Sequence, residues 1–225
     1  MPKAHGAICF ASQQALPPAV LPALRLATRH QEALAKLLPL LLCGEESAAL
    51  VFARFARDSA LSSCARGELK RIGEDERCHE RELQALRQAL PQVPVDDNVD
   101  RQTRRFFVRL AGEDLGTRFA RIAALDSGVC EILGAVRARG LPLRQDAAVC
   151  GILARIHQDE SRHVVVSRRY ARLLLDRHQA YTVAAEMREQ LATLMTLRCA
   201  ALADLGADPE RLLARLRRVP RRLLA

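Results

Sequence analysis

The sequence of 225 residues is poor in aromatic side chains, which make up only 4% of it. Strands favour aromatic and β-branched residues, so this scarcity argues against a sheet. Alanine, leucine and arginine recur along the chain instead, and all three favour helices. The composition therefore predicts an all-α protein, and we expect residues 1–225 to form one domain with a full core.

The sequence also lacks the marks of a membrane or secreted protein. No apolar run reaches the length of a bilayer-spanning helix, and Met1 to Gly6 lack the charged and apolar regions of a signal peptide. The seven cysteines are scattered without a Cys-x-x-Cys pair, which is typical of reduced thiols in a helical core. We expect a cytoplasmic protein with no membrane partner.

The sequence has fewer acidic residues (26) than lysines and arginines (35), so its formal net charge is +9. A basic surface can bind nucleic acid, an acidic carrier protein or an anionic substrate. Solvated faces of an arginine-rich chain explain the same excess, and we favour that interpretation. The positive charge is concentrated only near the C-terminus, at Arg211, Arg215, Arg217, Arg218, Arg221 and Arg222.

Apolar residues recur at helical spacing in four long segments. The predicted helices cover about residues 38–62, 68–90, 113–138 and 145–177. Accessory helices are expected at about 21–38 and within 182–219, the first with Pro39 kinking it or starting the next helix. A polar connector at 91–103, followed by a short helix near 104–110, joins the second long helix to the third.

Two of the long helices carry the same acid-acid-x-x-His motif. The copies are Asp75-Glu76-Arg77-Cys78-His79 and Asp159-Glu160-Ser161-Arg162-His163. Residues three apart share a helix face, so the glutamate and the histidine of each copy project together. One such pair is common on exposed helices, but both copies lie on core stripes, where an unpaired charge is costly.

Each motif follows a helix that carries an acid in its own apolar face, Glu45 in the first case and Asp126 in the second. Carboxylates and imidazoles together suit non-haem iron and manganese. A bundle in which two helices give Glu-x-x-His and two give one more acid can hold two metals. The six candidate ligands are Glu45, Glu76, His79, Asp126, Glu160 and His163.

Alternatives exist for both single acids. Glu46 is next to Glu45, but its helix face also carries arginines, so we prefer Glu45. Glu131 is closer to the hairpin turn than Glu160 is, which gives a height mismatch of roughly 6 Å along the helices. Asp126 lies level with Glu160, so we prefer it to Glu131.

The paired motifs resemble those of the ferritin-like diiron superfamily, in which an acid and a following Asp-Glu-x-x-His occur twice. The resemblance covers about residues 38–177. It implies a ferritin-like four-helix bundle with a long crossover connection and flanking helices, two iron ions or one iron and one manganese, and the six ligands named above. It further implies that Asp75 and Asp159 hold the histidines from outside the ligand set.

Two more residues have open interpretations. His157 is either a partly exposed polar residue, which we favour, or an extra iron ligand like that of ferritin-like arylamine N-oxygenases such as p-aminobenzoate N-oxygenase. Tyr170 shares the helix face of His163 and is either a core residue, a hydrogen-bond donor near the metals or an oxidisable group.

The resemblance implies a diiron oxygenase or oxidase. With O2 and an electron donor, such a monooxygenase would hydroxylate, desaturate or N-oxygenate a small or carrier-bound organic substrate, as a monomer or homodimer. Iron storage is the main alternative, but storage proteins usually have acidic inner surfaces. An RNA hydroxylase similar to the ferritin-like tRNA hydroxylase would suit the charge, although the sequence has no known RNA-binding motif. A scaffold without metals is disfavoured by the six ligands.

Small residues near the site have two interpretations: they leave space for O2 and substrate, or they let the helices pack closely. They are Ala48, Ala49, Ala123, Ser127, Gly128 and Ser167.

Overall fold

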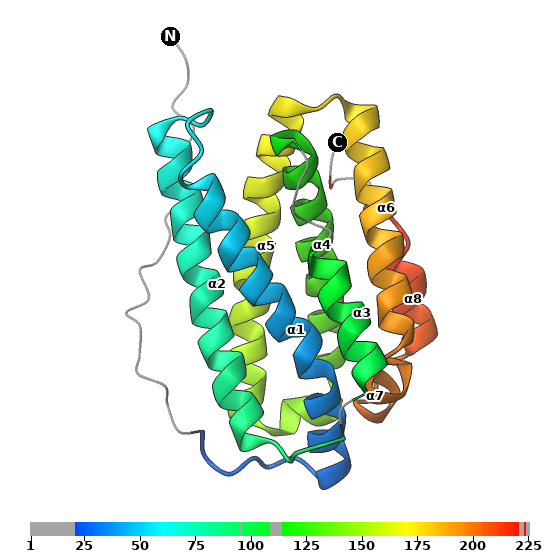
Figure 1. Ribbon diagram of the computed structural model, residues 1–225. Helices are drawn as coiled ribbons and strands as arrows, with labels where there is room; N and C mark the ends of the chain where they lie inside the picture. Colours follow the sequence, from blue (N-terminus) through cyan, green and yellow to red (C-terminus); the bar gives the residue numbers. More distant parts are fainter. Residues whose placement is uncertain (1–20, 95, 109–113, 221–222, 224–225) are drawn as a thin grey trace.

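The computed structural model describes residues 21–94, 96–108, 114–220 and 223, and all regular structure among them is helical (Figure 1). The helices are α1 (Thr28–Phe55), α2 (Ser63–Ala89), α3 (Asp97–Val108), α4 (Leu115–Val136), the 3-10 helix η1 (Pro142–Gln145), α5 (Ala147–Leu174), α6 (Arg177–Thr196), α7 (Cys199–Asp204) and α8 (Pro209–Leu216). The predicted all-α class is therefore confirmed for the described residues.

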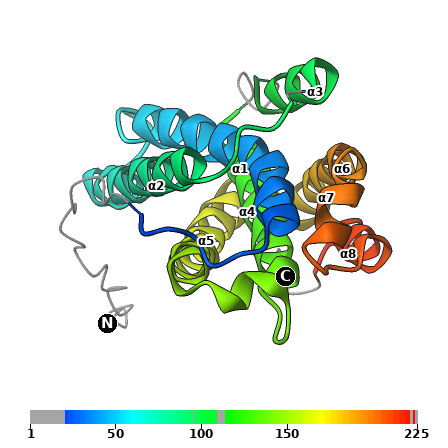
Figure 2. The same ribbon diagram turned by 90° about the horizontal axis from the view of Figure 1, so that it is seen from below.

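The four longest amphipathic segments form two helical hairpins. Helix α1 packs along α2 and α4 packs along α5, and the two hairpins lie side by side (Figure 1). Viewed from below, α3 lies against α1, whereas α6 and α8 lie beside α4 (Figure 2). The buried apolar side chains of all these helices belong to one continuous core.

Acidic and hydroxyl side chains mark where most of the helices begin. Ser62, Asp114, Asp146, Asp176 and Asp208 each accept a hydrogen bond from a backbone N–H in the first turn of the helix that follows. The buried carboxylate of Asp146 also accepts from the backbone N–H of Arg25. This second bond ties the segment before α1 to the start of α5.

Helix α1 corrects the predicted boundary at Pro39. The accessory helix at 21–38 and the first long helix are a single helix from Thr28 to Phe55, and residues 21–27 are not helical. A proline inside a helix removes one backbone hydrogen bond. Leu38, Leu40 and Leu41 are all at most 3% exposed, so burial of the leucines around the proline outweighs the lost bond.

The connector between the hairpins is more helical than predicted. Helix α3 begins at Asp97 instead of near 104, because the Asp96 carboxylate accepts hydrogen bonds from the N–H groups of Asn98 and Val99. Phe106 and Phe107 are buried and anchor the helix. The accessory helices expected within 182–219 are α6, α7 and α8, and α6 begins earlier than predicted, at Arg177.

The six cysteines among the described residues are free, as predicted, but none of them is fully buried, contrary to the predicted core position. Cys64 is exposed, and Cys43, Cys78, Cys130, Cys150 and Cys199 are half-buried, while Cys9 lies outside the described residues. None of the helices in the described ranges combines the length and the apolarity needed to cross a bilayer.

Candidate metal centre

The six predicted ligands converge between the two hairpins. Glu45 comes from α1, Glu76 and His79 from α2, Asp126 from α4, and Glu160 and His163 from α5. All six are buried, with at most 5% of any one exposed. Their donor atoms form two groups, each within 4.8 Å: Glu45, Glu76, His79 and Glu160 in one, and Asp126, Glu160 and His163 in the other. Glu160 belongs to both groups.

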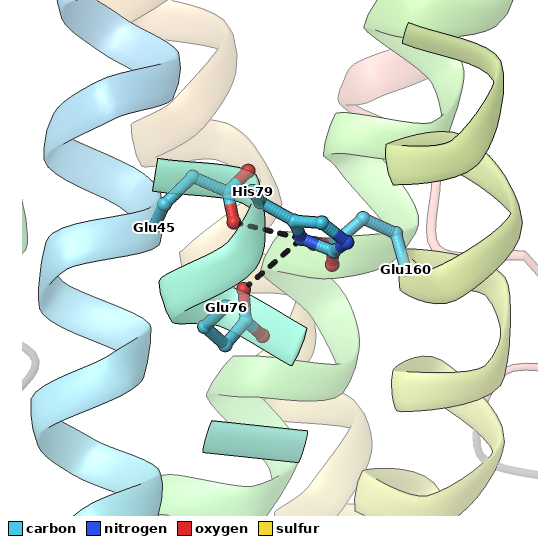
Figure 3. Close-up of side chains that lie close together, drawn as sticks. All are labelled: Glu45, Glu76, His79 and Glu160. Atoms are coloured by element: carbon cyan, nitrogen blue, oxygen red, sulfur yellow. Dashed lines mark hydrogen bonds and ion pairs between the residues drawn. The ribbon is translucent and has the colours of Figure 1, made fainter. Parts of the chain in front are cut away.

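The first group is arranged around one imidazole nitrogen (Figure 3). His79 Nδ1 lies 3.1 Å from Glu45 Oε2, 3.6 Å from Glu76 Oε2 and 3.8 Å from an oxygen of Glu160. A ring nitrogen carries one proton at most, so it cannot donate to all three carboxylates. A cation among these atoms would satisfy all of them at once.

The second group leaves polar atoms without partners. His163 Nδ1 lies 3.0 Å from Glu76 Oε1, but neither atom has a partner in hydrogen-bond geometry. Asp126 Oδ2 is also buried without a partner. Buried polar atoms are rarely left unsatisfied, so these atoms are candidates for contact with an ion or another ligand. This donor set of four carboxylates and two imidazoles suits iron or manganese.

Each motif helix holds the histidine of the other. His79 Nε2 forms a 2.9 Å hydrogen bond with Asp159 of α5, and His163 Nε2 lies 3.4 Å from Asp75 of α2. These contacts fix the ring orientations, so that both Nδ1 atoms face the centre. The reciprocal arrangement requires the two motif helices to be neighbours in space.

The polar contacts between α2 and α5 show that the two helices are antiparallel. Partners on α5 come earlier in the sequence as those on α2 come later: Glu68 with Tyr170, Asp75 with His163, His79 with Asp159, and Glu82 with Arg155. Sequence reasoning missed Arg162, which forms ion pairs with both Asp75 and Asp159. Its position three residues after Asp159 on the helix was an available signal.

Burial of the acids shapes the electrostatics of the centre. Burial raises the pKa of Glu45 well above its ordinary value, although attraction to His79 opposes the shift. Burial also raises the pKa of Asp126 well above the usual range, with repulsion from Glu160 and Glu76 adding to it. Burial and then repulsion from Glu76 raise the pKa of Glu160 as well.

The pKa values of the two histidines are raised, whereas burial alone would lower the pKa of an imidazole. Burial alone would lower the pKa of His79, but Glu45 and Asp159 outweigh burial and hold it well above its ordinary value. Burial is likewise outweighed at His163, whose pKa is raised by Glu76 and Asp75. Raised pKa values favour protons on Glu45, Asp126 and Glu160 when no cation is bound, whereas the pKa of Glu76 is lowered, because His163 and His79 outweigh burial there. Metal ions would bind in exchange for the protons on the acids and the imidazoles.

The alternative ligands lie outside both groups. Glu46 is exposed, and His157 is half-buried with a pKa lowered by burial and by Arg137. Glu131 faces away from the centre: its Oε1 accepts a 2.7 Å hydrogen bond from the fully buried Arg188, and its Oε2 lies 3.1 Å from Arg215. Glu131 therefore helps to attach α6 and α8 to α4.

Tyr170 and the six small residues named above are also not part of the two groups. The Tyr170 hydroxyl donates a 2.9 Å hydrogen bond to Glu68 Oε2. Gly128 serves close packing, because a Cβ there would lie 2.3 Å from a methyl group of Leu191 on α6. Ser127 accepts a 3.4 Å hydrogen bond from Arg188. Of these six small residues, Ala48 lines a cavity that Asp126 also lines.

A narrow cavity of about 20 Å³ reaches the centre between α1, α3 and α4. Its walls are mostly apolar and include Ala48, Val51, Phe107 and Leu125, and the candidate ligand Asp126 also lines it. A volume of about 10–15 Å³ is enough for one water molecule, so this space admits a molecule of the size of O2. Arg118 and Arg121 also line it.

No protein-family model matches the sequence, and no curated protein matches it either.

Proposed function

We propose that the protein is a non-haem diiron oxygenase or oxidase in which α1, α2, α4 and α5 form a ferritin-like four-helix bundle. The observation that carries the proposal is the buried convergence of four carboxylates and two imidazoles from four helices. Such a cluster is costly to bury unless cations or protons compensate its charge. Asp126 Oδ2, which is buried without a hydrogen-bond partner, supports a cation in addition to protons.

The chain would contribute ligation, orientation and exclusion of water. His79 and Glu45 would hold one iron ion, Asp126 and His163 the other, with Glu76 and Glu160 placed between the two. Asp159 and Asp75 would keep each imidazole pointed at its ion through Nε2. The bound ferrous ions would supply the electrons that reduce O2. One iron and one manganese would suit the same donors.

The cavity beside Asp126 supports a reaction with O2. Its mostly apolar walls suit a small uncharged molecule, and the candidate ligand Asp126 is one of its lining residues. An organic substrate is larger than this space, so Val51 or Phe107 would have to move before it could approach by this path. We expect oxidation of a small or carrier-bound organic molecule, with electrons from a separate donor.

The first test is metal stoichiometry together with molecular mass. Protein loaded anaerobically with ferrous iron is expected to bind two ions per chain, as a monomer or homodimer, and to change its visible absorption when O2 is added. Glu45→Gln should lose metal, whereas its neighbour Glu46→Gln is the matched control and should not, because Glu46 is exposed. Equal effects of the two substitutions would contradict the assigned site.

The same measurement separates the alternative functions. Many irons per chain in a large shell would indicate iron storage instead. Tight binding of RNA that weakens steeply with salt would favour an RNA-modifying enzyme. Absence of bound iron and manganese in the wild-type protein would refute the metal centre itself.

A further inference from the structure

A second pocket, of about 270 Å³, lies between α1, α3 and the junction of α6 with α7, and we call it the Arg198 pocket. Helix α1 packs against both α3 and α7 (Figure 2). Within the described chain, none of the residues that line this pocket belongs to the two ligand groups or to the narrow cavity. The lining residue nearest in sequence to a candidate ligand is Pro39, six residues before Glu45, or about 9 Å along α1. The Arg198 pocket is therefore distinct from the candidate metal centre.

The Arg198 pocket has the size and walls of a site for a small organic molecule. Its volume is close to the lower end of the range for ligand sites, which begins at about 300 Å³. Lys36 and Ala200 line the pocket and are exposed, so solvent reaches it. The apolar part of the lining includes Pro39, Val99 and Leu197. A ligand bound there would bury a short apolar body against these side chains.

Arg198, which lines the pocket, is a buried cation with incomplete hydrogen bonding. The residue is only 3% exposed, and its Nη2 donates a 2.6 Å hydrogen bond to Thr103 Oγ1. Its Nε and Nη1 are buried and have no hydrogen-bond partner among the described residues. A buried donor without an acceptor costs free energy, and a buried charge costs more. Unsatisfied cationic donors beside a pocket indicate an anionic ligand.

The acids that line the pocket leave these donors unsatisfied. The Asp96 carboxylate accepts hydrogen bonds from backbone N–H groups at the start of α3, and Asp100 accepts from neither Nε nor Nη1 of Arg198. Burial lowers the pKa of Arg198, although the charge of Asp100 opposes the shift. Lys36 adds a second positive charge to the lining. A ligand with one negative charge suits this lining better than a dianion, since both acids would repel further negative charge.

We propose that the Arg198 pocket binds a small organic carboxylate with a short apolar body. The carboxylate would accept a charge-assisted hydrogen bond from the Arg198 guanidinium, and Lys36 would add attraction. Because Nε and Nη1 are themselves buried, binding requires a rotation of the guanidinium that turns one of them to the pocket. The inference goes beyond the proposed function, since it uses no metal ion and no residue of the metal centre.

The test is isothermal titration calorimetry of the full chain with isovalerate, a short branched carboxylate. We expect one molecule to bind per chain, with the same affinity before and after a chelator removes any metal. Isovaleramide has the same apolar body without the charge, and inorganic phosphate has charge without the body. Each should bind roughly tenfold more weakly than isovalerate or worse. Equal affinity for either control, or binding that requires metal, would overturn the assignment.

Arg198→Met tests the cation itself. The substitution should weaken isovalerate binding roughly tenfold or more, because it removes the charged donor. Without ligand, the Tm should be unchanged or higher, because replacing a buried, incompletely paired charge by an apolar side chain is often neutral or stabilising. A lowered Tm together with unchanged binding would make Arg198 a structural cation and overturn the proposal.

Two pairs of variants at exposed positions separate ligand binding from folding. Ala200→Phe fills the pocket and should weaken binding roughly tenfold, whereas Ala203→Phe, on the same helix but outside the lining, should bind like wild type. Lys36→Met should weaken binding a few-fold, whereas Lys70→Met, which removes an exposed lysine of α2, should not. Equal binding within both pairs would overturn the site.

The outcomes separate this inference from the proposed function. A protein that binds two irons per chain but no isovalerate would overturn the role of the Arg198 pocket and leave the diiron assignment standing. Glu45→Gln should lose metal and keep its affinity for isovalerate, because Glu45 does not line the pocket. Loss of isovalerate binding in this variant would place the carboxylate at the metal centre instead.

Discussion

The two histidines of the centre have the same motif but different surroundings. His79 makes a 3.1 Å contact with Glu45 and a 2.9 Å hydrogen bond with Asp159, whose side chain is only 9% exposed. His163 lies 3.4 Å from Asp75, whose side chain is 30% exposed. The acid behind His79 is therefore closer and less exposed than the acid behind His163. In this sense we call the His79 half the tight half and the His163 half the looser half.

The single acids of the two halves differ in the same direction. Glu45 reaches His79, whereas Asp126, one methylene shorter, leaves Oδ2 without a hydrogen-bond partner and lies beside the narrow cavity. The comparison teaches that an internal repeat of two motifs need not give two equivalent sites. We expect the His79 half to bind metal more tightly and the Asp126 half to accept O2.

The largest effect is expected where the two halves meet. Glu160→Ala removes the carboxylate that belongs to both groups, so metal content should fall from two ions per chain to none. When free metal is at 100 times its dissociation constant, each occupied site should stabilise the wild-type fold by about 2.7 kcal/mol, which raises Tm by roughly 5–10 °C. Glu160→Ala should show no such rise in Tm.

The metal-free form of this variant provides the control. Burial and repulsion from Glu76 raise the pKa of Glu160, so its charged form is disfavoured in the absence of a cation. Metal-free Glu160→Ala should therefore keep a Tm close to that of metal-free wild type. A strongly lowered Tm would mean that Glu160 stabilises the fold and would weaken its assignment as a shared ligand.

The second effect compares the two acids that hold the histidines. Asp159→Asn should weaken metal binding by about 10–100-fold, which is typical of removing a hydrogen-bonded acid behind a ligand. Asp75→Asn should weaken it less, because the Asp75 contact is longer and more exposed. Titration of both variants with Fe²⁺ under anaerobic conditions measures the difference. Equal losses would show that the halves are equivalent.

Part of this asymmetry was visible in the sequence, and part was not. Helix rise alone predicts that Asp126 and Glu160 lie at the same height along their two helices. The structure brings Asp126, and not Glu131, to the cluster. The reciprocal contacts of Asp75 and Asp159 depend on the antiparallel packing of α2 against α5. A periodic pattern within one helix carries no information on which helix will be its neighbour.

The fold shows the same division between local and tertiary causes. Periodicity predicted the ends of α4 and α5 to within three residues, because their apolar stripes are long, but it placed the start of α2 five residues too late. The continuity of α1 through Pro39 depends on the burial of the surrounding leucines, which the local signal of a proline contradicts. The contact of Tyr170 with Glu68 is likewise set by two separate helices.

The third effect exchanges the lengths of the two single acids. Glu45→Asp withdraws the carboxylate from His79 and should weaken metal binding at the tight half. Asp126→Glu adds a methylene beside the cavity, so it should keep the metal content but slow the reaction with O2. Stopped-flow absorption after O2 addition measures the rate, and metal analysis measures the content. The reverse pattern would place O2 at the Glu45 side.

The smallest effect concerns the cavity itself. Ala48→Leu should fill a space of about 20 Å³ and slow the reaction with O2 a few-fold, whereas Val51→Ala should widen it and leave the rate equal or faster. Neither residue belongs to the two ligand groups, so the metal content should be unchanged in both. Opposite shifts from two substitutions one turn apart on α1 are hard to produce by a general loss of packing. Equal rates in both variants would show that O2 reaches the centre by another path, and the looser half would then differ from the tight half in ligation alone.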